Sequence, residues 1–183
     1  KANRTRLDRK RCWWCGTDPI YVRYHDTEWG VPVRDDRKLF EMLILEGFQA
    51  GLSWIMVLKK RENFRRAFKN FDPVKVARFT KRDIARLMND AGIVRNRLKI
   101  SAAVSNARCF LEVKKEFGSF SNYIWQFTGG KTLRARHDLH PGKLPATTKE
   151  SDAMSKDLKA RGFKFVGSTV CYAHMQATGM VDD

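Results

Sequence analysis

The sequence has few acidic side chains, few cysteines and no long apolar run. It carries 20 Asp and Glu against 36 Lys and Arg, a net charge of +16. An excess of this size favours a polyanionic partner, with nucleic acid as the first candidate and a membrane surface as the second. No apolar stretch approaches the roughly 18 residues of a membrane-spanning helix, and no signal-peptide core follows the basic N-terminus. We therefore expect a soluble, cytoplasmic protein without a membrane partner.

The 4 cysteines are too few for a disulfide framework in a chain of 183 residues without an export signal. Cys109 and Cys171 lie in apolar helical patterns, which are typical of buried thiols. Cys12 and Cys15 form a C-x-x-C pair, which fits either a redox centre or half of a zinc site. The redox interpretation needs an adjoining βαβ pattern, and none follows. His25, thirteen positions after Cys12, is either a core histidine or a metal ligand.

The spacing of apolar residues predicts an all-α fold. Helical patterns separated by Gly and Pro fill the chain, without a convincing alternation of strand type and without an internal repeat. Residues 1–11 are rich in Lys and Arg and predict a basic, disordered arm. Residues 12–183 predict a single domain with two helical lobes, in which 128–148 is a long loop. That loop holds His137 and His140, for which the sequence suggests no partners.

Two helix starts and one helical hairpin can be predicted from local signals. Asp18 followed by Pro19 is a favourable N-cap and first turn, and Thr80 with Asp83 has the spacing of a capping box. A helix from Thr80 is expected to end with Gly92 at its C′ position, and a partner helix with cations in its first turns runs on to about residue 117. Such a hairpin either holds phosphate on backbone amides or is a plain pair of helices with a wet basic face.

Residues 39–54, LFEMLILEGFQAGLSW, contain the acid of greatest interest. Glu46 falls on the same helical stripe as Leu39 and Leu43, whereas Glu41 lies on the other side and is expected to be solvated. Burying a lone carboxylate is costly, so Glu46 must be protonated, paired or directed into a polar cavity. The sequence pattern leaves two interpretations open, a base-binding acid and a structural acid paired with an arginine from elsewhere.

Aromatic residues lie both before and after Glu46 in the sequence. Gly47 and Gly51 are expected to break the helix, and Ser53 offers an N-cap for a following helix that opens with Trp54. Upstream, Tyr21 and Tyr24 share one helical face, an arrangement that is more often core than site.

Several long blocks resemble the 3-methyladenine DNA glycosylase I family, a divergent branch of the helix-hairpin-helix glycosylases. The blocks span residues 11 to 181 and read RCWWCGTDPIYVRYHDTEWG, LFEMLILEGFQAGLSWIMVLKKREN, FDPVKV, DAGIVRNRLKI and SDAMSKDLKARGFKFVGSTVCYAHMQATGMV. The resemblance implies a helix-hairpin-helix glycosylase bundle whose N- and C-terminal segments come together, with the hairpin at about 80–117. It implies a bacterial, nucleoid-associated enzyme that flips N3-methyladenine out of double-stranded alkylated DNA and hydrolyses its N-glycosidic bond without a lyase step.

The resemblance also implies roles for individual residues. Glu46 would be the catalytic acid, contacting the base edge and selecting the cationic lesion by charge. The aromatic residues that would enclose the base are Tyr21, Tyr24 and Trp54. The DNA contacts would come from a turn that fills the gap in the duplex and from the hairpin that clamps phosphate: Gln49, Gly51, Leu52, Ala91, Gly92, Ile93, Arg95, Arg97 and Lys99.

Zinc is implied by resemblance alone. The family joins its two ends with one structural zinc, held by an early Cys and His and a late His-x3-Cys pair. Cys12 and His25 match the early pair, whereas the late pair would lie beyond Asp183; Cys15 and His174 are weak substitutes. We expect no organic cofactor and a monomer. The rival interpretation is a non-catalytic basic helical module that binds nucleic acid.

Overall fold

The computed structural model describes residues 11–134 and 144–183, and within them the fold is all-α, as predicted. The N-terminal half contains η1 (Trp13–Cys15), α1 (Pro19–Thr27), α2 (Asp36–Gln49), α3 (Trp54–Lys59), α4 (Arg61–Ala67), η2 (Lys69–Phe71), α5 (Pro73–Ala77) and α6 (Lys81–Met88). The C-terminal half contains α7 (Arg97–Phe117), α8 (Phe120–Trp125), η3 (Gln126–Thr128), β1 (Leu133–Arg134), α9 (Lys149–Ala160), α10 (Ser168–Ala177) and β2 (Val181–Asp182).

Some expectations fall on segments that lie outside the described residues. These are the structure of residues 1–10 in the predicted arm and the positions of His137 and His140. Arg11, the last residue of that arm, is described and forms an ion pair of 2.8 Å with Asp26. No helix in the described ranges is both long and apolar enough to span a membrane.

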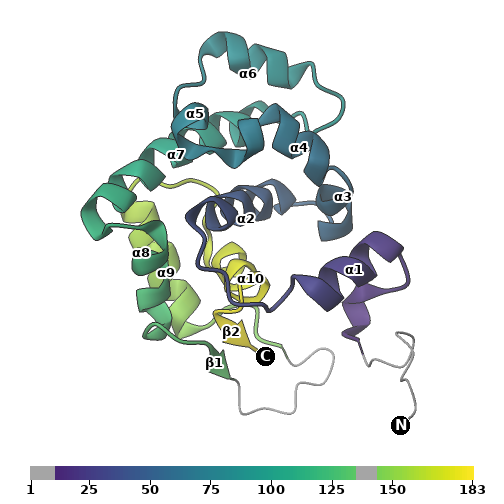
Figure 1. The fold of residues 1–183 in the computed structure, drawn as a ribbon, viewed down its shortest axis with the longest axis vertical. Coiled ribbons are helices and arrows are strands. Elements are labelled where there is room, and N and C mark those ends of the chain that lie inside the picture. The colour runs from purple at the N-terminus through teal and green to yellow at the C-terminus, as the bar shows by residue number, and fades with distance from the viewer. Residues whose placement is uncertain (1–10, 135–143) are drawn as a thin grey trace.

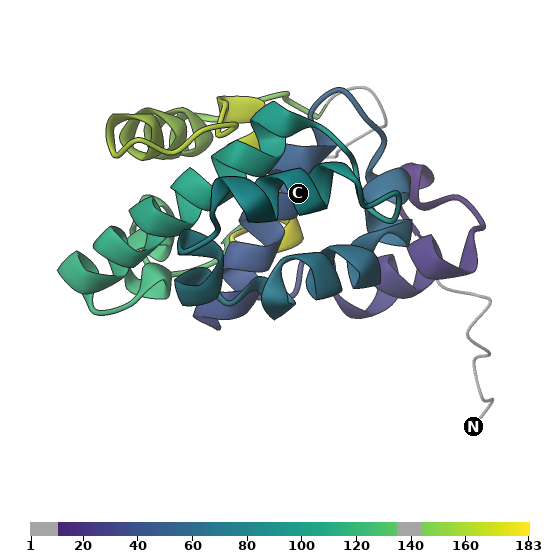
Figure 2. The ribbon, with the colours of Figure 1, turned by 90° about the horizontal axis from the view of Figure 1, so that it is seen from above.

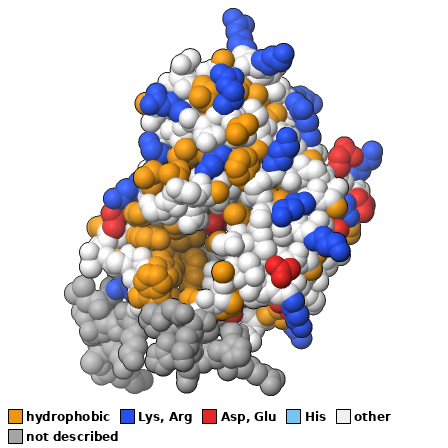
Figure 3. Space-filling model, turned by 180° about the vertical axis from the view of Figure 1, so that it is seen from behind, with side chains coloured by type: hydrophobic (Ala, Val, Ile, Leu, Met, Phe, Trp, Pro, Cys, Tyr) orange, Lys and Arg blue, Asp and Glu red, His pale blue; other side chains and the backbone are white. Residues whose placement is uncertain are grey.

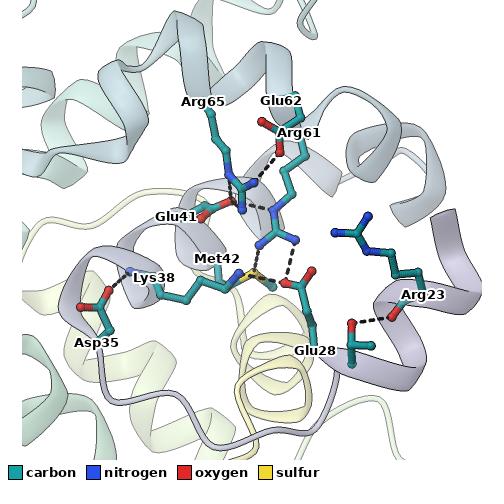
Figure 4. Close-up of polar contacts among 10 residues, drawn as sticks. Arg23, Glu28, Asp35, Lys38, Glu41, Met42, Arg61, Glu62 and Arg65 are labelled. Atoms are coloured by element: carbon teal, nitrogen blue, oxygen red, sulfur yellow. Dashed lines mark hydrogen bonds and ion pairs between the residues drawn. The ribbon is translucent and has the colours of Figure 1, made fainter.

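Helix α2 runs through the middle of the molecule and packs against α3, α7, α8 and α10 (Figure 1). Its residues from Leu39 to Phe48 are all buried, so the helix has no wet face over this length. Glu41 is therefore not solvated as expected: it is 7% exposed and pairs with Arg61 at 2.6 Å and Arg65 at 2.9 Å (Figure 4). The prediction failed because periodicity along one helix does not reveal that α4 covers its second face.

The end of α2 also differs from the expectation. Gly47 does not break the helix, which continues to Gln49. It packs against Phe165, whose Cβ lies 3.4 Å from where a Cβ on residue 47 would be. The chain turns instead at Gly51, whose φ of +78° favours glycine. Ser53 is the N-cap residue of α3, but its side chain makes no capping hydrogen bond.

The local start signals were correct, whereas the hairpin differs in detail. Asp18 caps α1 through the amide of Ile20, and Thr80 and Asp83 form the predicted capping box of α6. The second hairpin helix begins at Arg97, after an Asn96 cap. Gly92 is not a C′ residue with positive φ. It is needed because a Cβ would lie 2.9 Å from the Asp90 carboxylate and 3.1 Å from Asn63.

The segment that follows α1 lies against the segment that follows α10, so the N- and C-terminal parts of the chain come together as expected. The amide of Val33 donates to the carbonyl of Thr178 at 3.0 Å. A Cβ on Gly179 would lie only 2.5 Å from the backbone nitrogen of Pro32, so the two backbones touch directly. Strands β1 and β2 pair in parallel in this region; at two residues each, they are too short to show an alternating pattern. Helices α1 and α9 lie at opposite edges of the molecule (Figure 2).

Candidate active site

A cavity of about 460 Å³ opens between the segment before α1, helices α1, α2 and α3, and helix α10. One face of the molecule has a hollow lined with hydrophobic side chains, below a region rich in Lys and Arg (Figure 3). The described residues that line the cavity are Arg11, Cys12, Trp13, Trp14, Tyr21, Tyr24, Trp29, Glu46, Gln49, Trp54, Leu144, Ala173, Gln176, Ala177 and Asp183. All four residues predicted for the catalytic and base-binding roles are among them.

Glu46 is the buried acid of this cavity. Its side chain is 3% exposed, and no hydrogen bond or ion pair joins it to another residue in the described part of the chain. Burial raises the pKa of Glu46 to about 8, because the cavity cannot solvate the carboxylate as water does. The acid therefore holds its proton at neutral pH when the cavity is empty. Glu41, not Glu46, is the structural acid paired with arginines.

The predicted aromatic residues form one wall of the cavity. The rings of Tyr24 and Trp54 are 5.6 Å apart, and Tyr21 contacts Trp14 at 5.0 Å. Burial, and then the charge of Glu46, raise the pKa of Tyr24 well above 10, so this phenol stays neutral. Burial likewise raises the pKa of Tyr21. The wall is thus uncharged and aromatic on the side that faces the acid.

Sequence reasoning missed two tryptophans and one helix face of the cavity. Trp14 and Trp29 lie 5.2 Å apart in an edge-on contact, brought together by η1 and the turn after α1. No sequence pattern indicated their convergence. Helix α10 contributes Ala173, Gln176 and Ala177, whose i, i+3, i+4 spacing did mark one face of that helix. Small residues there leave room for a ligand.

The turn after α2 occupies the place expected of a gap-filling element. Gln49 lines the cavity and is half-buried, while Gly51 is exposed and Leu52 is half-buried. The amide of Leu52 donates to the carbonyl of Gln49 at 2.6 Å, which closes the turn. The turn therefore lies beside the cavity and directly follows the helix that carries Glu46.

The hairpin residues divide into exposed and buried groups. Arg95, Arg97 and Ala91 are exposed, whereas the side chain of Ile93 lies in the core. The amide of Gly92 donates to the Asp90 carboxylate at 2.8 Å, and the amide of Ile93 donates to the Asp90 carbonyl at 3.3 Å. In this state those two amides are already satisfied by Asp90.

Lys99 does not lie on the basic surface. It is 8% exposed, and its ammonium donates to the carbonyls of Phe48 at 2.9 Å and Ala50 at 2.5 Å. Burial lowers the pKa of Lys99. The expectation that it contacts phosphate was wrong, because the first turn of α7 carries it inward against the end of α2.

Cys12 and His25 lie side by side, as a metal pair would. The Cys12 amide donates to Nε2 of His25 at 3.3 Å, and Asp26 holds Nδ1 at 3.0 Å. A carboxylate on Nδ1 would orient the ring as in a zinc-binding histidine, whereas Nε2 here accepts from the backbone amide of Cys12. The described residues nevertheless contain no group of three or more metal-ligating side chains.

The weaker cysteine hypotheses find no support. His174 is fully buried, and both its ring nitrogens lack hydrogen-bond partners among the described residues, so it does not complete a site with Cys15. Cys12 and Cys15 are free thiols, and burial raises the pKa of each. A redox pair needs a lowered pKa, so the oxidoreductase interpretation is disfavoured.

Comparison with known proteins agrees with the geometry. The family model "Methyladenine glycosylase" matches residues 14–183. The chain is 52% identical over 174 residues to DNA-3-methyladenine glycosylase 1 of Escherichia coli K12, covering 95% of this chain and 92% of the relative. A crystal structure of 3-methyladenine DNA glycosylase I superposes with a TM-score of 0.92 at 51% identity, covering 95% of both chains.

A further structure of 3-methyladenine DNA glycosylase I, a tyrosine-to-phenylalanine variant in complex with 3-methyladenine, has a TM-score of 0.90 at 38% identity. It covers 94% of this chain and 92% of its own. The fold, the cavity and the sequence therefore lead to one conclusion: the chain belongs to the methyladenine glycosylase family.

Proposed function

We propose that the protein is a DNA repair glycosylase that removes N3-methyladenine from alkylated double-stranded DNA by hydrolysis, without a lyase step. The observation that carries this proposal is the unpaired acid of the cavity, Glu46, facing the aromatic pair Tyr24 and Trp54. The relatives support it, because they are DNA-3-methyladenine glycosylases and one is solved with 3-methyladenine bound.

The chemistry follows from the charge of the lesion. Methylation at N3 makes the adenine cationic, so the base can depart neutral and the glycosidic bond is already weak. A base inside a duplex cannot be reached and must first be swung out, at a cost of a few kcal/mol. Glu46 then contributes by losing its proton to solvent as the cation enters, since an opposite charge lowers the pKa of a buried carboxyl. The glycosidic bond breaks with its electron pair going to the base, and water adds to the sugar carbon and releases a proton, which leaves the abasic site. The rings of Tyr24 and Trp54 add attraction to an electron-poor, cationic base.

The DNA surface would consist of the turn Gln49–Leu52 beside the cavity and the hairpin residues around Arg95 and Arg97. Both arginines are exposed, and the face of the molecule that has the hydrophobic hollow is rich in Lys and Arg (Figure 3). We take the protein to act as a monomer in the bacterial cytoplasm, because one chain supplies the whole cavity. A non-catalytic basic module explains the charge equally well, but it gives no reason to leave an acid buried and unpaired.

Release of free base tests the function directly. The wild-type protein is expected to release 3-methyladenine from methylated duplex DNA much faster than from the same DNA as single strands. The strand should stay intact until alkali cleaves it at the abasic site. Trp54→Ala should slow release by roughly 10-fold or more, since stacking on one aromatic side chain contributes about 1–3 kcal/mol. Chromatography measures the base, and gels measure the strand. Tight binding of methylated duplex without base release would favour the rival module.

We further infer that Cys12 and His25 are two ligands of a structural zinc, with Asp26 orienting the histidine. The described residues supply no third ligand beside this pair. Such a zinc would join the chain ends and take no part in the reaction. The protein is expected to contain about one zinc per chain, and His25→Ala is expected to lose the zinc and to melt at a lower temperature. Metal analysis that finds no zinc in the wild-type protein would refute the assignment.

A further inference from the structure

Lys99 is a buried cation without an acid. It is the third residue of α7, and no ion pair joins it to an acidic residue in the described ranges. Its ammonium instead meets the carbonyls of Phe48 and Ala50 and lies 6.0 Å from the ring of Phe165. Lysine is rarely buried in this way, because its charge must be satisfied by other means. Two backbone carbonyls, 51 and 49 positions earlier in the chain, satisfy the charge of Lys99 instead.

The two carbonyls belong to the end of the helix that carries Glu46. The last carbonyls of an α-helix have no partners within the helix, and a cation there is also favoured by the helix dipole. Lys99 satisfies one carbonyl in the last turn of α2 and one in the turn that follows. Gln49, which lines the cavity, lies between them. Lys99 therefore fixes the path of the chain where it passes from the acid to the exposed turn.

Lys99 lies close in sequence to the hairpin, so it joins the end of α2 to the hairpin. Lys99 lies four residues after the exposed Arg95 and two after the exposed Arg97, and its amide donates to the Asn96 side chain at 3.1 Å. The hairpin turn is itself held to α4, because Asn63 donates to the Gly92 carbonyl at 3.1 Å. The hairpin and the turn Gln49–Leu52 thus cannot shift relative to one another without breaking the contacts of Lys99.

We propose that Lys99 is a positioning residue that couples docking of the hairpin on the phosphate backbone to insertion of the turn Gln49–Leu52 into the duplex. The proposal rests on the proposed glycosylase function. The role of Lys99 is thus distinct from binding the base in the cavity and from attracting DNA phosphates. A base leaves the stack only if the turn enters the gap at the right distance from the clamped backbone. Lys99 sets that distance through its two carbonyl contacts.

The test uses Lys99→Met, which keeps the length of the side chain and removes the ammonium. Three quantities are measured well below the melting temperature: single-turnover excision from methylated duplex, affinity for undamaged duplex, and affinity for free 3-methyladenine. We expect excision to slow by about 10- to 100-fold, as misplacement by about an ångström does elsewhere. Both affinities should stay within about 2-fold of the wild-type values, because Lys99 touches neither the cavity nor the exposed cations.

Asn106→Ala is the matched control. Asn106 lies seven residues later on the same helix, about two turns along, and is also buried. It also bonds to backbone, donating to the Lys164 carbonyl at 2.9 Å and accepting from the Lys164 amide at 2.8 Å, and its described hydrogen bonds do not involve the turn Gln49–Leu52. Its excision rate should stay within about 2-fold of the wild-type rate. Three results would overturn the proposal: a wild-type rate in Lys99→Met, an equal loss in Asn106→Ala, or a parallel loss of free-base affinity. Failure of the wild-type protein to excise would instead overturn the proposed function.

Discussion

Replacing Glu46 with glutamine is expected to slow excision of 3-methyladenine by roughly 100-fold at pH 7 and, at the same time, to stabilise the fold. An ion pair at about 4 Å in a protein site of effective dielectric constant about 20 gains about 4 kcal/mol. Ionising a carboxyl with a pKa of about 8 at pH 7 costs about 1.4 kcal/mol of that gain. The remaining 2.6 kcal/mol or so corresponds to roughly 100-fold in kcat/KM, which includes binding of the cationic base.

The gain in stability follows from the same raised pKa. The folded protein keeps the proton of Glu46 up to a pH of about 8, whereas the unfolded chain releases it near the model value of 4.5. Stability from this group is thus complete below pH 4.5 and is lost progressively as the pH rises to about 8. At pH 7 the loss is roughly 3 kcal/mol, which glutamine avoids. The melting temperature should rise by roughly 6–12 °C.

Two pH profiles check both halves of this prediction. The kcat/KM of the wild-type enzyme should rise with pH and level off near 8, as Glu46 loses its proton, while Glu46→Gln should lack that rise. The difference in unfolding free energy between the two proteins should widen between pH 4.5 and 8. Glu112→Gln, at an exposed position on α7, is the matched control and should change neither profile. A Glu46→Gln protein of full activity would contradict the assigned role.

Removing the guanidinium of Arg61 is expected to cause a large loss of stability. Arg61 is 5% exposed and donates to Glu41 at 2.6 Å and Glu28 at 2.9 Å (Figure 4). Burial acts to lower the pKa of Arg61, but the charges of Glu41 and Glu28 raise it overall. Removing one partner of a buried ion pair costs about 3–5 kcal/mol, because the other charge stays buried. Arg61→Met should therefore lower the free energy of unfolding by that amount.

A second variant and a control make the Arg61 prediction specific. Combining Arg61→Met with Glu41→Leu removes both charges and should recover most of the loss. Arg65→Met removes the other cation on Glu41, but Arg65 is partly exposed and should cost about 1 kcal/mol or less. Urea unfolding measures all three. If Arg61→Met lowered the free energy of unfolding no more than Arg65→Met, the buried ion pairs of Arg61 would not have the stabilising role that their geometry indicates.

The sequence predicted the features that depend on neighbours in the chain. Asp18 before Pro19, and Thr80 with Asp83, are local hydrogen-bonding units, so their helix starts could be located. Glu46 could be singled out because an acid on an apolar stripe is costly wherever the helix is placed. Glu46 lines an aromatic cavity and has no arginine partner among the described residues, while its base-binding role stays a prediction.

The features that failed depend on contacts between distant segments. From residue type and local spacing, Glu41 was expected to face solvent and Lys99 was expected to contact DNA. Each is buried by an element that the local pattern does not show: α4 over Glu41, and the end of α2 over Lys99. The pairing of Trp14 with Trp29 depends on how η1 folds back on α1. None of these distances is encoded in periodicity.

The contact of Gly179 with Pro32 bears on how a base enters the cavity. The nitrogen of Pro32 lies 2.5 Å from the place of a Cβ on Gly179, and Val33 bonds to Thr178 beside it. The walls from α1 and α10 are therefore fastened backbone to backbone at their base. These two walls cannot separate to admit a ligand without breaking the hydrogen bond of Val33 to Thr178 and the contact of Pro32 with Gly179. With these walls held together, an extruded nucleotide has to enter through the existing opening of the cavity.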